Sequence, residues 1–200
     1  MEIFEAIKDR RSIRQQKPDS IDDETLQKIL EAARWAPSWA NTQTWRFVVV
    51  RDNDIKTQLA GTRPQRPPGP PPGGVRPDGP SGPPATASAI TQAPLIIVVC
   101  AELGKAGVRP DGTYTTDKGD TWYMYDTALA TQNLVLAAHA LGVGTVIMGA
   151  FDAKKAAEIL GVPEGYCVVV MIPLGFPAQE GRPPTRKELS EIVFYDKFQA

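Results

Sequence analysis

The 200-residue sequence predicts one domain in which helices and strands alternate along the chain. Three apolar runs, at 45–51, 94–101 and 166–174, have the length and β-branched composition of strands. Between them lie segments whose apolar residues recur at helical spacing, and two of these segments follow residues that commonly cap helices. The length allows a substantial core, either in one subunit alone or in one protomer of a dimer.

The first quarter of the chain predicts two helices, a strand and a third helix. Ile3, Phe4 and Ile7 mark a short amphipathic helix that ends near the turn at 10–12. Ser20 or Asp22 can cap a second helix, and Asp22, Asp23 and Glu24 would stand at its positive end. A strand over 45–51 and a short helix over 54–60 follow. The apolar face of the second helix consists of Leu26, Ile29, Leu30 and Ala33.

The second half of the chain continues the alternation. A strongly apolar strand over 94–101 precedes a long helix over 121–141 and a strand from Val143 to Met148. Asp152 caps the next helix, which runs through Leu160 and is closed by Gly161. Tyr166–Leu174 is the last strong strand. The tail, 175–200, contains a basic turn and a short helix.

Two loops interrupt this pattern. Residues 61–84 hold 10 of the 19 prolines, so this segment can join neither a helix nor a sheet ladder, and we expect it outside the core. Pro67 and Pro70 satisfy a PxxP spacing, which leaves an interaction module as one alternative function, although no Arg or Lys stands at the usual flanking position. The loop at 102–120 is polar and contains glycines.

Composition and charge exclude several classes of protein. With 22 basic and 23 acidic residues, the chain lacks the excess positive charge of a general polyanion binder. Cys100 and Cys167 lie inside apolar runs and are interpreted as reduced core residues. The N-terminus lacks the apolar core of a signal peptide, and no apolar run approaches 18 residues. We therefore expect a soluble, cytoplasmic protein that binds neither nucleic acid nor membrane.

Basic residues at the two ends of the chain are the strongest binding candidates. Guanidinium groups together with a hydroxyl suit a phosphate dianion, because charge-assisted hydrogen bonds to such an anion are strong. The alternative interpretation is that these residues are solvated surface charges. The candidates are Arg10, Arg11, Ser12 and Arg14 near the N-terminus, and Arg186 and Lys187 near the C-terminus.

The segment APSWANTQTWRF, at 36–47, combines two tryptophans with hydroxyl and amide side chains. Tryptophan is costly to leave in water, and amides are costly to bury without partners. A flat, half-polar aromatic ligand would satisfy both kinds of group. The sequence therefore predicts that this turn forms one wall of a site for such a ligand.

Conventional catalytic groups are scarce. His139 is the only histidine and lies within an apolar helical segment, so it is interpreted as a packed or partly exposed helix residue rather than a general base. The sequence shows neither a nucleophile motif nor spaced metal ligands, and we expect no metal site. If the protein is an enzyme, its reactive group comes from a cofactor.

Four segments in order resemble the nitroreductase family of FMN-dependent oxidoreductases. They are RRSIR at 10–14, PDSIDDETLQKILEAARWAPSWANTQTWRFVVV at 18–50, LGVGTVIMGAFD at 141–152, and the stretch at 160–198. The resemblance covers nearly the whole chain except 61–84 and 102–120. It implies an α+β fold with a central mixed, mainly antiparallel sheet flanked by helices, in an intertwined homodimer. It also implies that 1–200 is one FMN-binding domain with an insertion at 61–84.

The resemblance assigns cofactor-binding roles to the residues singled out above. It implies that the two basic segments hold the FMN phosphate, that the polar-aromatic turn lines the flavin of the partner subunit, and that the segment after the GxG strand offers backbone N–H groups to the reactive edge of the flavin. Thr44 departs from the family pattern, which usually has proline there. The implied residues are Arg10, Arg11, Ser12, Arg14, Arg186 and Lys187 for the phosphate, Pro37, Ser38, Trp39 and Asn41 for the wall, and Met148, Gly149 and Ala150 for the edge.

The implied activity is transfer of hydride from NAD(P)H to a flat, electron-poor acceptor, such as a nitroaromatic or quinone-like compound, by a ping-pong mechanism. In this interpretation the flavin, and no side chain, carries the hydride. Three alternatives within the same fold are dehalogenation, enoate reduction and flavin fragmentation. A further alternative is an FMN-binding protein of low turnover, whose loop at 61–84 obstructs the pocket.

Overall fold

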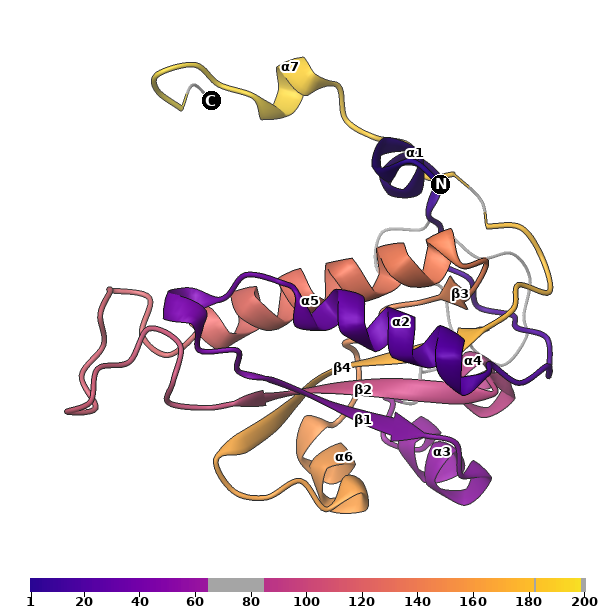
Figure 1. Cartoon of the computed structure of the whole chain (residues 1–200). Coiled ribbons are helices and arrows are strands. Elements are labelled where there is room, and N and C mark those ends of the chain that lie inside the picture. Colours follow the sequence, from indigo (N-terminus) through magenta and orange to yellow (C-terminus); the bar gives the residue numbers. More distant parts are fainter. Residues whose placement is uncertain (65–84, 182, 199–200) are drawn as a thin grey trace.

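The computed structural model describes residues 1–64, 85–181 and 183–198 (Figure 1). Four strands form one sheet in the order β1-β2-β4-β3, and every ladder between them is antiparallel. The N-terminal segment adds one parallel contact, an isolated bridge from Ser12 to Thr145 of β3, so the sheet is mixed and mainly antiparallel as predicted. The strands are β1 (Trp45–Val50), β2 (Leu95–Glu102), β3 (Gly144–Thr145) and β4 (Tyr166–Gly175).

Helices cover both faces of the sheet, which gives the α+β architecture that the sequence predicted. On one face lie α2 (Asp23–Arg34) and α5 (Trp122–Ala140), and on the other lie α3 (Asn53–Ala60) and α6 (Ala153–Leu160) (Figure 1). The central strand β2 serves both layers. Leu95, Ile97 and Val99 belong to the core beneath α2 and α5, whereas Ile96, Val98 and Cys100 belong to the other core.

Capping residues begin and end the helices where the sequence placed them. Asp22, rather than Ser20, caps α2, because its carboxylate accepts the Thr25 N–H at 2.7 Å. Asp152 caps α6 in the same way, through the Lys155 N–H at 3.1 Å. Gly161 then ends α6 in the left-handed conformation, with φ of +64°, which glycine adopts without steric cost.

Two elements differ from the prediction. The strand expected over 143–148 is only Gly144–Thr145, because the chain leaves the ladder after Thr145 and touches the sheet again only where Met148 bridges Met171. Helix α4 (Ala85–Gln92) was not predicted, since its short sequence ATASAITQ has no strong apolar periodicity. Most of the predicted Pro-rich loop, residues 65–84, lies outside the described residues.

The N-terminal segment is held against late parts of the chain. The Ile13 N–H donates to the Thr145 carbonyl at 2.8 Å, and the Lys17 N–H donates to the Phe176 carbonyl at 2.8 Å. The Ala178 N–H donates in return to the Gln15 carbonyl at 3.0 Å. Residues 12–17 therefore form an extra strip along the edge of the sheet, although they lie some 130 or more positions away in sequence from their partners.

Both ends of the chain expose apolar side chains. Helix α1 (Ile3–Asp9) forms as predicted, but only Ala6 is buried, and Phe4 is 81% exposed. The tail projects away from the body of the protein and carries the short helix α7 (Leu189–Ile192) (Figure 1). Tyr195 and Phe198 in this tail are largely exposed. None of the described helices is both long and apolar enough to cross a membrane.

Candidate functional site

The structure brings basic groups from the two ends of the chain together. Ser12 and Arg14 are half-buried on the strip that runs beside β3, and Arg10 is half-buried just before the strip. Burial lowers the pKa of Arg10, and the neighbouring charges of Arg11 and Arg186 lower it further. Arg11 and Arg186 are therefore near enough to act on the charge of Arg10, and an anion bound among these guanidinium groups would offset this repulsion.

Arg11 has a second role within this group. Its guanidinium Nη1 donates to the carbonyls of Lys8, at 2.6 Å, and Arg10, at 2.9 Å, which are at the end of α1. Arg11 therefore contributes its charge to the basic cluster while its hydrogen bonds stabilise the helix end. Arg186 and Lys187 lie on the exposed tail, where no described carboxylate pairs with either of them.

A cavity of about 510 Å³ lies beside the basic cluster. Its walls come from the end of α1, the end of α5, β3, residues 177–181 and Pro183, and they include Arg10, Arg11 and His139. Gly144 allows this close packing, because a Cβ there would stand 2.8 Å from the Ile13 Cβ. The cavity thus lies where the N-terminal segment meets β3 and the loop after β4.

The predicted ring-edge segment follows β3. The Met148 N–H donates to the Met171 carbonyl at 2.9 Å, so this amide is already occupied. Gly149 and Ala150 are exposed, and their N–H groups donate to no described residue. Of the three residues predicted to offer N–H groups, only these two present open donors. They stand four and five residues beyond Thr145, within roughly 17 Å of it.

The polar-aromatic turn has an unusual backbone. Ala40, Asn41 and Gln43 all adopt positive φ, at 43°, 57° and 47°, although none is glycine. Side chains that adopt such angles are uncommon, and each strained residue costs roughly 1–3 kcal/mol. Within the turn, the Gln43 N–H donates to Ser38 Oγ at 2.9 Å. Pro37 and Asn41 are exposed, and Ser38 and Trp39 are half-buried.

A buried carboxylate on α5 holds the turn. Asp126 is 1% exposed and accepts the Trp39 N–H on Oδ1 at 3.0 Å. Thr42 Oγ1 lies 3.5 Å from its other oxygen. Burial raises the pKa of Asp126, and the hydrogen bonds from Trp39 and Thr42 oppose that rise. This residue was not among those predicted from the sequence, although it is the only carboxylate within the long apolar helix.

Trp39 packs within a cluster of aromatic rings. Its ring centroid lies 4.7 Å from that of Trp122 on α5, and Trp122 contacts Tyr125 edge to face with centroids 5.8 Å apart. Tyr125 is mostly exposed. The turn and the first residues of α5 therefore present an aromatic surface, which suits stacking against a flat ligand.

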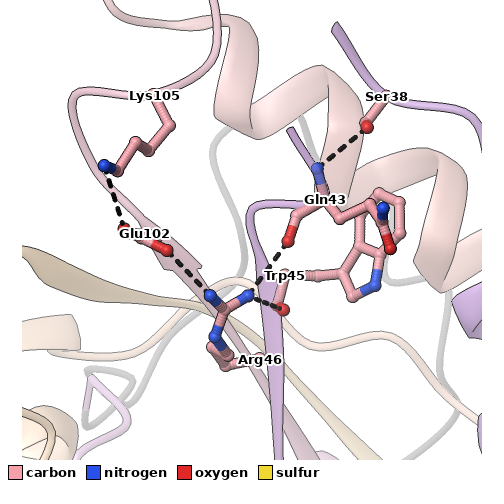
Figure 2. A network of polar contacts seen from close by, with 6 residues as sticks. All are labelled: Ser38, Gln43, Trp45, Arg46, Glu102 and Lys105. Atoms are coloured by element: carbon pink, nitrogen blue, oxygen red, sulfur yellow. Dashed lines mark hydrogen bonds and ion pairs between the residues drawn. The ribbon is translucent and has the colours of Figure 1, made fainter. Parts of the chain in front are cut away.

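A second network of polar contacts, shown in Figure 2, connects the C-terminal end of the turn to the sheet. Arg46 Nη1 donates to the carbonyls of Gln43, at 2.9 Å, and Trp45, at 2.8 Å. Arg46 Nη2 pairs with Glu102 at the end of β2, at 2.8 Å, and Lys105 stands 3.6 Å from the same carboxylate. The predicted wall is thus anchored to β1, β2 and α5.

The predicted site residues fall into two groups that one subunit keeps apart. The turn is fastened near the start of α5, at Asp126, whereas the basic cluster and its cavity adjoin the end of the same helix, at His139. Thirteen residues of helix separate these positions, which corresponds to about 20 Å. One subunit therefore does not bring the turn and the basic cluster together around a single site.

The model of the nitroreductase family matches residues 7–176. A protein of Archaeoglobus fulgidus, named as a candidate NADH dehydrogenase/NAD(P)H nitroreductase, is 33% identical over 183 residues, which are 90% of this chain and 87% of that protein. The solved FMN-dependent nitroreductase of Clostridium difficile R20291 is 27% identical, with a TM-score of 0.72 over 98% of this chain and 99% of that one.

Iodotyrosine deiodinase of Nematostella vectensis is also similar. It is 28% identical over 201 residues, which are 96% of this chain and 74% of that protein.

Proposed function

The chain belongs to the nitroreductase family and is an FMN-dependent NAD(P)H oxidoreductase, and we propose that it passes hydride to a flat, electron-poor acceptor of the nitroaromatic or quinone type. The observation that carries the proposal is the pair of donor sets along β3. Guanidinium groups gather at one end, and the open N–H groups of Gly149 and Ala150 stand beyond the other. The guanidinium groups suit a phosphate, and the N–H groups suit the edge of a ring that bears hydrogen-bond acceptors.

The residues present fit FMN, and each can be assigned a task in holding it. Arg10, Arg14 and Arg186 would hold the phosphate through charge-assisted hydrogen bonds. Gly149 and Ala150 would donate to the edge of the ring, and the aromatic turn would cover its face. When bound, FMN supplies the two-electron chemistry, accepting hydride from NAD(P)H and giving it up to the acceptor. The side chains are needed for binding, orientation and exclusion of water, which explains why no nucleophile or general base stands out.

A homodimer is part of the proposal. Because about 20 Å of α5 separates the turn from the basic cluster, the turn of one subunit would line the FMN bound to the other. The exposed apolar residues of α1 and of the tail support this arrangement, since large apolar side chains exposed in such number are typical of an interface. The projecting tail would then pack against the second subunit (Figure 1).

We further propose that NAD(P)H and the acceptor use one pocket in turn. The sequence has no Rossmann fingerprint that would hold a dinucleotide in a site of its own. A shared pocket predicts ping-pong kinetics, in which double-reciprocal plots at several acceptor concentrations are parallel.

Dehalogenation is a second candidate, favoured by the similarity to iodotyrosine deiodinase. An FMN-binding protein of low turnover is a third. In both cases the phosphate and ring-edge residues would keep the same roles. A dehalogenase would differ in its acceptor, and a low-turnover protein would differ in its rate.

Purification followed by stopped-flow spectroscopy tests the proposal. The purified protein should be yellow, and NADH or NADPH should bleach the flavin absorbance. A panel of nitroaromatics, quinones and iodotyrosine should then restore the colour at rates that identify the acceptor class. Rapid reduction with no reoxidation by nitroaromatics or quinones would reject the proposed acceptor class. A protein that binds FMN but is not reduced by either nucleotide would instead support the low-turnover alternative.

A further inference from the structure

The loop between β2 and α5, residues 103–121, is fastened to the first residue of α5. The Trp122 Nε1–H donates to Thr116 Oγ1 at 3.0 Å. Gly107 lies against the same indole, because a Cβ at this position would overlap Trp122 Cδ1. Two separate points of the loop therefore fix the orientation of one ring.

The loop is itself folded, so it can act as a fixed support for that ring. The Thr115 N–H donates to the Gly107 carbonyl and the Arg109 N–H donates to the Thr113 carbonyl, both at 2.8 Å. The Arg109 guanidinium also donates to the Tyr114 carbonyl at 2.9 Å. These bonds cross the loop and hold in place the two points that contact the indole.

Trp122 stands between two other rings of the aromatic cluster. Its ring centroid lies 4.7 Å from that of Trp39, in the turn, and 5.8 Å from that of Tyr125. The loop and the turn meet at the same end of α5 (Figure 1). Trp39 is half-buried and Tyr125 is mostly exposed, so both can contact a ligand. A rotation of the Trp122 indole would displace both neighbours, because rings at these separations are in close contact.

We propose that Thr116 and Trp122 are positioning residues for the acceptor: Thr116 orients the Trp122 indole, and the indole holds the rings of Trp39 and Tyr125 as a surface on which an aromatic acceptor stacks. This inference rests on the proposed function, because it requires the turn to lie at the flavin. Nitroaromatic and quinone rings are electron-poor, and Trp and Tyr rings are electron-rich, so offset stacking between them is favourable.

The hydrogen bond between the hydroxyl and the indole sets the size of the effect. A hydrogen bond between neutral groups corresponds to a factor of about two to ten in a binding constant. Without this bond the indole is free to rotate, and acceptor binding should weaken within that range. The redox chemistry belongs to FMN, so the maximal rate should change less than the affinity.

Four single variants test the role of this bond. Thr116→Val replaces the hydroxyl by a methyl group of similar size, and Trp122→Phe keeps a ring but removes the donor. Thr116→Ser keeps the hydroxyl. Thr115→Val is the matched control, because Thr115 is exposed and its hydroxyl bonds to no described residue.

Two constants are measured for each FMN-loaded protein. The first is the concentration of a nitroaromatic acceptor that half-saturates reoxidation of the dithionite-reduced protein in stopped flow. The second is the dissociation constant of benzoate, a flat aromatic that takes no hydride, from the change in flavin absorbance.

In Thr116→Val and in Trp122→Phe, both constants should rise by about twofold to tenfold, while the maximal rate of reoxidation stays within about twofold. The double variant should bind no more weakly than Trp122→Phe alone, because both changes remove the same hydrogen bond. Thr116→Ser and Thr115→Val should match the wild type. Either of the first two variants suffices for the test if the other does not fold.

Unchanged constants in Thr116→Val would overturn the inference, as would a double variant in which the two effects multiply. The benzoate constant keeps this inference separate from the proposed function. A wild type that binds FMN and benzoate but is not reoxidised by nitroaromatics or quinones would reject the proposed acceptor class. The benzoate constants of the variants would still decide the role of Thr116.

Discussion

Removing the carboxylate of Asp126 should loosen the turn that it holds. In Asp126→Ala, the Trp39 N–H loses a charged acceptor at 3.0 Å, while the contact to Thr42 at 3.5 Å is too long to contribute much. A hydrogen bond to a charged group contributes about 1.5–3 kcal/mol. The turn also contains three non-glycine residues at positive φ, which tend to relax once the anchor is lost.

We therefore expect a loss of about 2–3 kcal/mol in the free energy of unfolding of Asp126→Ala. For a chain of this size, each kcal/mol lowers Tm by roughly 2–4 °C, so Tm should fall by about 4–12 °C. Asp126→Asn keeps an oxygen that can accept the Trp39 N–H, and its loss should stay below about 1 kcal/mol. Thermal unfolding followed by circular dichroism measures these changes.

Asp117→Ala is the matched control, because Asp117 is an exposed carboxylate in the loop before α5. Its Tm should stay within about 2 °C of the wild type. If Asp126→Ala melts at the same temperature as Asp117→Ala, the carboxylate does not anchor the turn and the reasoning fails.

The contribution of Asp126 to the free energy of unfolding should depend on pH in a defined direction. Since burial raises the pKa of Asp126 above its ordinary value of 3.8, the folded state holds this proton more tightly than the unfolded state. The stability that comes from this tighter proton binding is fully present below the pKa of Asp126 in the unfolded protein. It is lost as pH rises through the pKa of Asp126 in the folded protein. The stability of the wild type relative to Asp126→Asn should therefore fall as pH rises through that window, as measured by urea unfolding.

Three further predictions concern the cofactor, the dimer and the insertion. Arg14→Ala and Arg186→Ala should each weaken FMN binding by about 1–3 kcal/mol, and their combination should be non-additive if they share one phosphate; unchanged affinity in both would make them surface charges. Analytical ultracentrifugation should find a dimer at micromolar concentration, and a monomer that retains FMN would refute the two-subunit site. Replacing residues 64–83 by a short Gly-Ser linker should leave Tm and FMN content nearly unchanged while KM for bulky acceptors shifts, whereas loss of flavin would give the insertion a structural role.

Strong local patterns made most of the fold predictable. Asp22, Asp152 and Gly161 each satisfy a local backbone requirement, so sequence alone located those helix ends to within a residue. The apolar strand at 94–101 is buried on both faces, as its uninterrupted composition indicates. The prediction was wrong where tertiary contacts determine the structure. After β3, the predicted strand leaves the ladder for two residues before Met148 bridges Met171.

The site was predictable only in part, because its residues depend on distant neighbours. The basic segments could be identified from their charge, but the approach of Arg186 to Arg10 spans most of the chain. Asp126 was missed because it stands alone among apolar helix residues, and only the packed structure shows that it holds the turn. Nothing in the residue types of Ala40 and Gln43 indicates a left-handed backbone.

The strip formed by residues 12–17 sets an order of events during synthesis. Its backbone partners are Thr145 and the residues around 176–178, so the arginines that flank or belong to the strip have no fixed place until those residues have left the ribosome. At about 5–20 residues per second, some 160 further residues take roughly 8–32 s to appear. The first residues made are among the last to be positioned, and a nascent chain that stalls before residue 145 lacks the groups that organise its phosphate site.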